Sequence, residues 1–519
     1  MDSARKLAAG GRCRGGGSRI KDIGAALGNV EALPNQRSRF AAFAFLLQRC
    51  ANSKALCDGR LIHAHLTRHN YDTSTYLANW VVKMYGDCGS LAEARAVVDC
   101  LPNANAYSWN ILIKAYCKNG LCRQAVECFY KMQRCGIAPT HVSFVSVLEA
   151  CASMAALEEG KLIHAAAVKA GYEGHVVVGT ALLNLYGKCG SLEDARIVFR
   201  QMPNRDVVTW SAMITACAQN GHGKEALEWY NRMEENGIRA NQFTFVSALD
   251  ACASLAALEQ GQKIHTSVVL YGYERQAIVG TALVHMYGKC RRLEDARRVF
   301  DQLHQRDVVC WGAMITACAQ NGHGKEALNL FSRMQSDGFK ANHITYASAL
   351  DACASLAALE KGQELHASIV DSGLEGETGI GNALVDMYGK CGNLKDARTV
   401  FSRMRHRDLV SWNAMIGACA QNGHGEEALD FFHQMRSKGV KPDHLTFLSI
   451  LTACKHAGKV DEARQYFVSI NENHGIAQTR GHYMCLIDIL GRAGRLDDAE
   501  DLIKNMPLEC GASCLQSLR

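Results

Sequence analysis

Proline is scarce in this chain, which has six among its 519 residues. Long stretches without proline are free to form helices. The sequence also lacks any run of eighteen apolar residues, so it offers no candidate for a transmembrane helix. Charge of one sign is not in strong excess, since 57 basic residues face 51 acidic ones and the net charge is +6. A charge this mild permits an anionic partner without indicating one.

Apolar residues make up 48% of the sequence and charged residues 21%, which excludes a disordered chain. Cysteine is abundant, with 23 residues, but disulfide scaffolds are typical of short secreted chains. These cysteines recur within apolar helical patterns. We therefore expect buried thiols in a reducing compartment.

An internal repeat of 101 residues dominates the sequence. The chain is too long for one ordinary core, and the repeat indicates an array rather than unrelated domains. The residues that recur at this step are Trp109, Trp210, Trp311 and Trp412; Cys151, Cys252, Cys353 and Cys454; and His63, His164, His265 and His366.

Each 101-residue unit divides into sub-repeats of 35, 35 and 31 residues, and each sub-repeat is predicted to form a helix, a short turn and a second helix. In the motif 308–342, the pattern predicts helices over Trp311–Gln320 and Lys325–Asp337. Asn321–Gly324 is expected to make the turn, because asparagine and glycine tolerate left-handed backbone angles. Gly338 stands where a helix-terminating glycine is expected.

The second helix of this motif indicates how the repeats hold together. Leu328, Phe331 and Met334 fall at a spacing of three, which predicts one buried stripe. A helix pair this short cannot bury its apolar face alone, so neighbouring pairs must stack. The predicted fold is all-α: a right-handed superhelical α-solenoid of about fourteen helix-turn-helix repeats of 31–36 residues.

The array is predicted to span residues 40–510, with a short tail at 511–519. Residues 1–39 form a basic, glycine-rich segment that is poor in acidic residues. This composition fits an organelle transit peptide, although Asp2 and Asp22 weigh against one, and it fits an unstructured tail equally well.

The alternating lengths carry the phrases W-x-A-M-I, A-C-A-S-L and Y-G-K-C-G-x-L-x-D-A-R. Together they resemble the pentatricopeptide repeat family, and in particular its plant class, whose arrays alternate ordinary, long and short motifs. The resemblance covers about nine-tenths of the chain, from Phe40 to Cys510. Tetratricopeptide repeats are the nearest alternative, but their period of about 34 residues is uniform. The resemblance implies recognition of single-stranded RNA, with one base read per repeat by two or three side chains.

In this family the fifth residue of a motif and its last residue read the base. Carried over residue by residue, the RNA-binding pairs are Asn79 with Asn105, Asn110 with Thr140, Thr180 with Asp206, Ser211 with Asn241, Thr281 with Asp307, Gly312 with Asn342, Asn382 with Asp408, and Asn413 with Asp443. The second residue would wedge apolar surface between bases, and these residues are Val177, Val208, Ile278, Val309 and Val410. Gly379 lacks the side chain for such a wedge.

The chemistry of these positions is consistent with base reading. We expect the fifth residue to face a groove where packing needs no polar group, so that its amide or hydroxyl is free to bond a base edge. By the family's correspondences the implied target is Y-n-n-G-A-n-G-n-n-U-U from 5′ to 3′. Gly312 offers no side chain, and Asn110 with Thr140 has no clear correspondence. The long motifs should read poorly, because their fifth residues are Ala44, Val145, Val246, Ala347 and Leu448.

Helix capping is the alternative interpretation of the last residues. Asp206, Asp307 and Asp408 precede predicted helix starts, and aspartate is a good N-cap residue. Capping and base contact are compatible, but capping alone requires no change of identity between repeats.

No catalytic residue, metal site or cofactor is expected. A zinc deaminase needs H-x-E and P-C-x-x-C, and none of the six prolines precedes a cysteine. The single H-x-E, at His424, is a variant of a turn that recurs in sister repeats. His63 and His65 face different sides of a helix, and Cys510 and Cys514 have no partner cluster.

The segment 482–509 resembles the final short motif of RNA-editing family members. In those members an extension follows that recruits or carries a deaminase, and here the match stops after Glu509.

We therefore expect a protein that binds single-stranded RNA in mitochondria, or else in plastids, and specifies a cytidine-to-uridine editing site for a deaminase acting in trans. A factor that protects or processes RNA is the alternative, and a protein–protein scaffold is the rival from another class. Neither a membrane nor a small-molecule substrate is expected.

Overall fold

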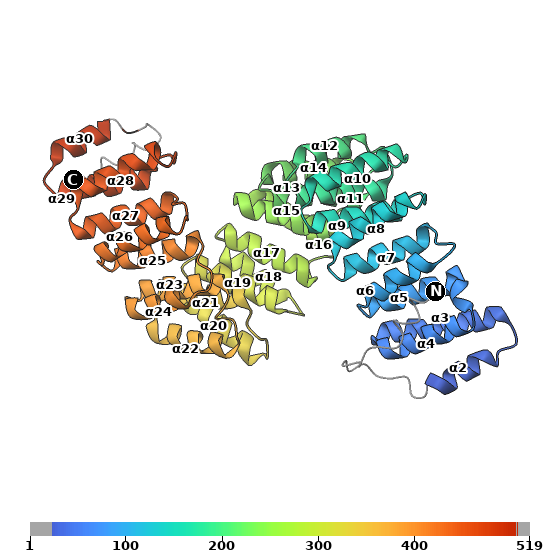
Figure 1. Ribbon diagram of the computed structural model, residues 1–519. Helices are drawn as coiled ribbons and strands as arrows, with labels where there is room; N and C mark the ends of the chain where they lie inside the picture. Colours follow the sequence, from blue (N-terminus) through green and yellow to red (C-terminus); the bar gives the residue numbers. More distant parts are fainter. Residues whose placement is uncertain (1–22, 505, 507–519) are drawn as a thin grey trace. The chain divides into compact units, whose positions relative to one another are not determined.

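The structure is a computed structural model that describes residues 23–504 and residue 506. The predicted tail at 511–519 and most of the basic segment at 1–39 lie outside the described residues. The chain divides into two compact units, Met1–Ala251 and Cys252–Arg519. The described part is helical throughout, which confirms the predicted all-α repeat fold (Figure 1).

Fourteen helix pairs follow one another in the described residues, from α3–α4 to α29–α30. The first helices of the pairs are α3 (Gln36–Ser53), α5 (Thr75–Asp87), α7 (Ala106–Lys118), α9 (His141–Ser153), α11 (Val176–Lys188), α13 (Val207–Gln219), α15 (Gln242–Leu255), α17 (Ala277–Lys289), α19 (Val308–Gln320), α21 (His343–Ser355), α23 (Thr378–Lys390), α25 (Leu409–Gln421), α27 (His444–Ala457) and α29 (Arg480–Arg492). The second helices are α4 (Leu56–Arg68), α6 (Leu91–Cys100), α8 (Cys122–Arg134), α10 (Leu157–Lys169), α12 (Leu192–Gln201), α14 (Gly223–Glu235), α16 (Leu258–Leu270), α18 (Leu293–Gln302), α20 (Gly324–Ser336), α22 (Leu359–Asp371), α24 (Leu394–Arg403), α26 (Gly425–Ser437), α28 (Val460–Glu472) and α30 (Leu496–Lys504). Helix α2 (Ile23–Glu31) precedes the pairs, and a 3-10 turn, η1 (Tyr71–Thr73), lies between α4 and α5.

Within each unit the first helices stack on one another. In the first unit α5, α7, α9, α11 and α13 make successive contacts, and in the second unit the odd-numbered helices from α17 to α29 do the same. Second helices pack against the first helix of their own pair and of the next pair, as α8 does on α7 and α9 and α20 on α19 and α21. The first helices of a unit therefore form one layer, and the residues predicted to read RNA lie in these helices or immediately before them.

Helix α19 begins earlier than predicted, at Val308 rather than at Trp311. The apolar pattern places the start at the first bulky core residue, whereas the helix begins where Asp307 caps it. The Asp307 carboxylate accepts hydrogen bonds from the backbone N–H groups of Val309 and Cys310, at 3.0 and 2.9 Å. Capping at this position, the alternative considered for the last residue of each motif, is therefore present.

The predicted turn in this motif is only partly correct. Gly322 has a φ of +81°, as expected for a left-handed position, but Asn321 has a φ of −98°. The Asn321 side chain instead donates to the carbonyl oxygen of Ala317 at 2.8 Å and to that of Gly288 in the preceding motif at 2.9 Å. Asparagine serves here to join two motifs. Gly338 has a φ of +84° and terminates α20 as predicted.

The buried stripe of α20 lies close to the predicted one. Phe331 and Met334 are buried as expected, but Leu328 is half-buried and Ala327 and Leu330 face the core with them. A helix advances 100° per residue, so a face defined by spacings of both three and four includes Ala327 and Leu330 and leaves Leu328 at its margin.

A close contact between backbones recurs where a short motif meets the next ordinary motif. A Cβ placed on Gly288 of α17 would lie 2.6 Å from the Cβ of Ala317 in α19. Two carbon atoms in van der Waals contact lie about 3.5–4.0 Å apart, so only glycine fits. The same contact occurs between Gly86 and Ala115, Gly187 and Ala216, and Gly389 and Ala418.

The recurring histidines and cysteines are structural. His164 Nδ1 lies 2.8 Å from the Tyr186 hydroxyl, and equivalent bonds join the other recurring histidines to tyrosines. Burial lowers the pKa of His164, which favours its neutral form. Cys151 is fully buried as a free thiol, as predicted, and burial raises its pKa to about 12. None of the helices in residues 23–504 is both long and apolar enough to span a bilayer.

Candidate nucleic-acid interface

Apolar side chains at the second position of the motifs project from the layer of first helices. The five predicted wedge residues are 47–58% exposed: Val177, Val208, Ile278, Val309 and Val410. The same position is exposed in motifs for which no wedge residue was predicted, at Tyr76, Tyr107, Val142, Phe243, Ile344 and Leu445. Exposed aromatic and aliphatic side chains at one position of successive helices form an apolar row in each unit. The prediction named five residues at this position and missed these six.

The fifth residue lies one helical turn after the second, on the same side of its helix. The structure places it deeper than expected. Asn79, Asn110, Thr180 and Ser211 are buried, and the side chains described as half-buried are those of Thr281, Asn382 and Asn413. The expectation that packing makes no use of this polar group is wrong, since each bonded fifth residue reaches the first helix of the next motif.

Asn413 shows this bonding most fully. Its Nδ2 donates to Asp443 Oδ1 at 3.0 Å, and its Oδ1 accepts a hydrogen bond from Thr446 Oγ1 at 2.6 Å. Asp443 caps α27 by accepting from the Thr446 backbone N–H at 2.8 Å. The predicted pair is thus brought together, and a third residue, the hydroxyl at position three of the next motif, holds both members.

Two further predicted pairs are joined directly. Asn110 Nδ2 donates to Thr140 Oγ1 at 3.0 Å, and Ser143 supplies the third hydroxyl, 2.6 Å from Asn110 Oδ1. Asn382 Nδ2 lies 3.3 Å from Asp408 Oδ1. The pair without a previous interpretation, Asn110 with Thr140, therefore has the same geometry as the others.

Two more pairs are joined through the third hydroxyl alone. Thr180 Oγ1 lies 3.1 Å from Thr209 Oγ1, which donates to Asp206 at 2.9 Å. Thr180 also bonds the carbonyl oxygen of its own helix at Val176, at 2.9 Å. Ser211 is held likewise, between the Val207 carbonyl oxygen and Thr244, and Thr244 bonds Asn241.

The remaining predicted pairs lack one or more of the hydrogen bonds that join the pairs above. Thr281 bonds the thiol of Cys310, which stands where other ordinary motifs carry a hydroxyl. Asn342 caps α21, and Gly312 offers it no side chain. Among the described residues no direct hydrogen bond joins Asn79 to Asn105, and the buried Oδ1 atoms of Asn79 and Asn382 have no hydrogen-bond partner. An acceptor left unbonded in this way costs about 1–3 kcal/mol.

The capping carboxylates of Asp443 and Asp408 stay ionised at neutral pH. Burial would raise the pKa of Asp443, but hydrogen bonds from the Thr446 backbone and hydroxyl, from Asn413, and the charge of His444 together lower it below its ordinary value. Asp408 behaves in the same way, with Ser411 and Asn382 as its donors. Both carboxylates therefore remain hydrogen-bond acceptors under physiological conditions.

We expect the third hydroxyl to matter for stability. Replacing Thr446 with valine keeps the shape of the side chain but removes the hydroxyl that donates to Asn413 Oδ1 and accepts from the Asp443 backbone N–H, which leaves the Asn413 oxygen unbonded. The expected loss is about 1–3 kcal/mol of local stability, measured as a lower midpoint in urea unfolding of the full chain. Thr399→Val, at an exposed position of α24, is the matched control. Equal midpoints for Thr446→Val and wild type would show that this hydroxyl does not hold the pair.

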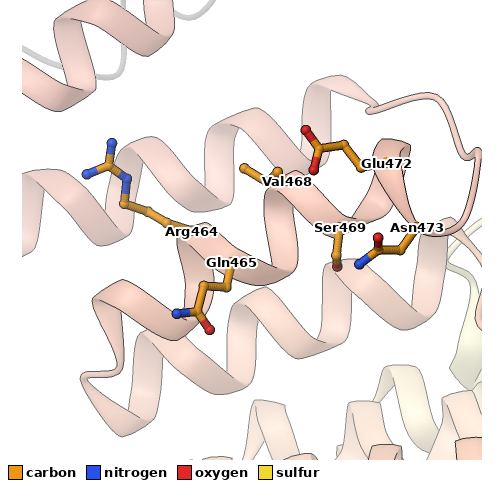
Figure 2. Close-up of a pocket in the computed structure, with 6 residues that line it drawn as sticks. All are labelled: Arg464, Gln465, Val468, Ser469, Glu472 and Asn473. Atoms are coloured by element: carbon orange, nitrogen blue, oxygen red, sulfur yellow. The ribbon is translucent and has the colours of Figure 1, made fainter.

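Two surface hollows lie away from the second and fifth residues of the motifs. One is lined by Arg464, Gln465, Val468, Ser469, Glu472 and Asn473, all on or next to α28 (Figure 2). Another lies along α8, at Glu127, Tyr130, Gln133 and Arg134. Both are on second helices, so they are separate from the row of second and fifth residues on the first helices.

The fold and this interface define a helical-repeat protein in which many motifs present an exposed apolar residue, and several ordinary and short motifs add a pair of polar residues. Sequence profiles of the "PPR repeat family" match residues 104–153, 205–254, 306–355 and 407–456, and those of the "PPR repeat" match 180–207, 281–308, 382–409, 445–474 and 482–509. The chain belongs to the pentatricopeptide repeat family.

Similar proteins from Arabidopsis thaliana support this assignment. The chloroplastic pentatricopeptide repeat-containing protein At1g11290 is 37% identical over 467 residues, which cover 90% of this chain and 58% of that protein. The mitochondrial protein At3g53360 is 32% identical over 91% of this chain and 75% of its own length. The chain thus spans little more than half of the first of these relatives. The expected organellar location agrees with the chloroplastic and mitochondrial names of these proteins.

Solved structures show the same fold. The maize pentatricopeptide repeat protein PPR10 superposes with a TM-score of 0.58 at 18% identity, over 95% of this chain and 76% of that one. PPR10 has also been crystallised in complex with an 18-nt psaJ RNA element.

Proposed function

We propose that the protein binds single-stranded RNA sequence-specifically in a plant organelle, reads one base per motif, and specifies a site for cytidine-to-uridine editing by a deaminase acting in trans. The observation that carries the proposal is an exposed apolar residue beside a bonded polar residue in four motifs: Tyr107 with Asn110, Val177 with Thr180, Val208 with Ser211, and Val410 with Asn413. A base stacked against the apolar row would bring its edge to the polar pair one helical turn away.

The pair of Asn413 and Asp443 offers a donor next to an acceptor. Asn413 Nδ2 carries two hydrogens and gives one to Asp443 Oδ1, so the second is left to donate. Asp443 Oδ1 receives these bonds, and its other oxygen, Oδ2, takes no part in them. Uracil presents an N–H donor beside carbonyl acceptors. The pair therefore complements uracil, as the family's correspondence implies.

The pair of Thr180 and Asp206 offers acceptors instead. Thr180 uses its single hydroxyl hydrogen inside the protein, because Thr209 donates its own to Asp206. A lone pair of the Thr180 hydroxyl and the second carboxylate oxygen of Asp206 are therefore left to accept hydrogen bonds from a base. Guanine presents two neighbouring N–H donors on its Watson–Crick edge, so this pair complements guanine. At Ser211 the hydroxyl is bonded on both sides, and reading there falls mainly to Asn241.

The burial of the fifth residues limits the contact but is compatible with it. Only one edge of each side chain needs to face the base, and a fixed side chain loses little entropy when the base binds. A scaffold that binds proteins would gain nothing from polar pairs that vary while the hydroxyl beside them is retained. This observation favours RNA over a protein ligand.

Exchanging one fifth residue should change one base of the preferred RNA. Thr180→Asn converts an acceptor pair into a donor–acceptor pair, so we expect the preference at that base to shift from guanine toward uracil. A change of one base contact is worth about 1–3 kcal/mol. The measurement is a gel shift at fixed salt with RNAs that carry the implied target and differ only at this base.

Val145→Asn, in a long motif predicted not to read, should leave the preference at the tested base unchanged and is the control. Equal weak binding of the target RNA and its complement by wild type would favour the protein scaffold and refute the proposal. Unchanged selectivity in Thr180→Asn would refute the register of bases on motifs.

Editing and protection are separated by a different measurement. Organelle transcripts are compared between plants with and without the protein. A cytidine that is no longer converted supports editing, whereas transcripts that only shorten or disappear support a protective or processing role. Editing is supported so far by the resemblance of residues 482–509 to the last motif of editing factors.

A further inference from the structure

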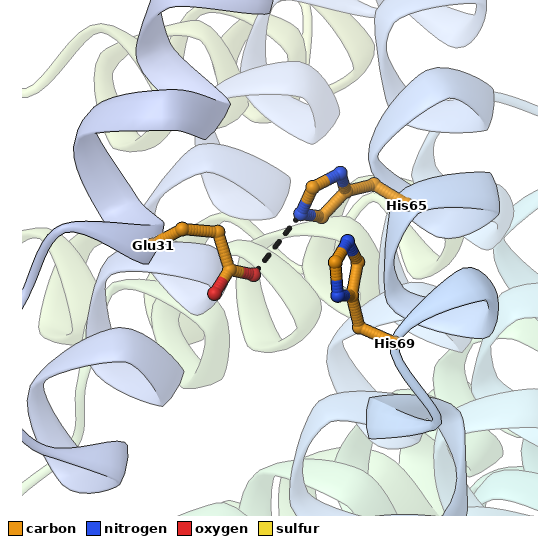
Figure 3. A group of neighbouring side chains, drawn as sticks. All are labelled: Glu31, His65 and His69. Atoms are coloured by element: carbon orange, nitrogen blue, oxygen red, sulfur yellow. Dashed lines mark hydrogen bonds and ion pairs between the residues drawn. The ribbon is translucent and has the colours of Figure 1, made fainter.

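A cluster of metal-binding side chains lies at the start of the array. Glu31 is the last residue of α2, His65 lies in the last turn of α4, and His69 caps the same helix one turn later. One ligand atom from each lies within 4.8 Å of the other two. Figure 3 shows the carboxylate and both imidazole rings turned toward a common point.

The spacing of the two histidines supports joint binding. Residues four apart face the same side of a helix, and the rings of His65 and His69 have centroids 4.4 Å apart. His65 Nε2 lies 3.1 Å from Glu31 Oε1. Ligands bound to one zinc ion at about 2.0–2.2 Å lie about 3.3 Å from one another, so small side-chain rotations would close the cluster on an ion.

Neighbouring groups hold the Glu31 carboxylate without blocking the space between its Oε1 atom and the two histidines. Arg39 and Tyr71 approach the other carboxylate oxygen of Glu31, Oε2, at 3.7 and 3.5 Å. Arg39 is fixed there, since its Nε donates to the Leu33 carbonyl oxygen at 2.9 Å. Oε1 therefore faces the histidines, and the guanidinium stays on the opposite side of the carboxylate.

We propose that Glu31, His65 and His69 form a binding site for a divalent zinc ion that ties α2 to the first helix pair. Two imidazoles and one carboxylate suit zinc, and a water would complete four ligands. Of the two histidines that the sequence places side by side, His63 bonds Tyr85. His69, four residues after His65, and Glu31, which precedes the array, were not singled out from the sequence.

The site has a consequence for the mature protein. Glu31 falls within the segment 1–39 that fits a transit peptide. A mature protein that keeps the site must therefore begin before Glu31, and cleavage before Ile23 would retain α2 whole.

The test is zinc binding by the full chain after treatment with a chelator. We expect one zinc ion to bind competitively against a chromophoric chelator, and His65→Ala, His69→Ala and Glu31→Gln each to weaken this binding by about tenfold or more. His222→Ala, an exposed turn histidine, should leave it unchanged. Circular dichroism confirms that each variant is folded. Zinc should also slow hydrogen exchange of α2 amides in wild type and not in His65→Ala.

Cobalt distinguishes this site from the chain's thiols. Cobalt bound to imidazole and carboxylate gives visible bands without thiolate charge-transfer absorption, and these bands should vanish in His69→Ala. Zinc affinity that is equal in wild type and all three variants would refute the proposal. So would a cobalt spectrum dominated by thiolate absorption that the variants leave intact. Either result leaves the RNA proposal untouched, because the two measurements share no residue.

Discussion

Loss of Tyr107 and Phe243 together is expected to weaken binding of the target RNA by roughly 30-fold or more. Both are exposed aromatic residues at the second position of their motifs, at 65% and 57% exposure. Stacking of a base on an aromatic side chain is worth about 1–3 kcal/mol per base, and each 1.4 kcal/mol corresponds to tenfold in affinity. Substitution by alanine removes both stacking surfaces. Because neither side chain is part of the core, the unfolding midpoint should not change.

The measurement is the dissociation constant of the double variant at fixed salt, since phosphate contacts make affinity strongly salt-dependent. Leu162→Ala is the control, because Leu162 is 63% exposed but lies on the second helix α10. We expect it to bind as wild type does. If the control weakens binding and the aromatic variant does not, RNA runs along the second helices and the interface proposed above is wrong.

Gly288→Ala is expected to lower the stability of the second unit by about 1–3 kcal/mol, the usual cost of overpacking a close interface. The added methyl would lie 2.6 Å from the Cβ of Ala317, so α17 and α19 would have to separate. Alanine is the better helix former by about 1 kcal/mol, and a net loss would therefore show that the clash dominates. The midpoint of urea unfolding measures the effect.

Two matched variants isolate the cause. Gly491 occupies the same position in the last short motif, and a Cβ there meets nothing within 4 Å in the described part of the chain. Gly491→Ala should therefore stabilise the protein slightly. Adding Ala317→Gly to Gly288→Ala moves the methyl from one helix to the other and should restore most of the loss. Destabilisation by Gly491→Ala equal to that of Gly288→Ala would rule out the clash as the cause.

Much of the fold could be predicted from the sequence because the repeat copies one solution many times. The spacing of tryptophans and the 35/35/31 alternation give the number of helix pairs, and Gly338 marks a helix end correctly. Local signals did not give the contacts between motifs. Asn321 fits a turn by its own propensity, yet its side chain reaches a carbonyl oxygen of the preceding motif. Such a bond depends on three-dimensional stacking, which periodicity does not encode.

In the candidate interface too, features within one motif could be predicted from the sequence, whereas contacts between motifs could not. The apolar second position is found by counting along each motif, and its exposure in Val208 and Val410 agrees with the prediction. The burial of Thr180 and Ser211 was not predicted, because their partners Thr209 and Thr244 lie in the following motif. A hydroxyl three residues after most capping residues is visible in the sequence, as T-W, S-W and T-F pairs, but its position alone does not show which side chain of the preceding motif it contacts.

The hydroxyl that holds a bonded polar pair belongs to the next motif, as Thr446 does for Asn413. An engineered array that is joined at the motif boundaries would separate the fifth residue of one motif from the hydroxyl of the next motif that orients it. A better segment to exchange runs from one recurring tryptophan to the next, for example from Trp109 to Trp210. Such a segment contains each fifth residue together with the capping residue and the hydroxyl that follow it.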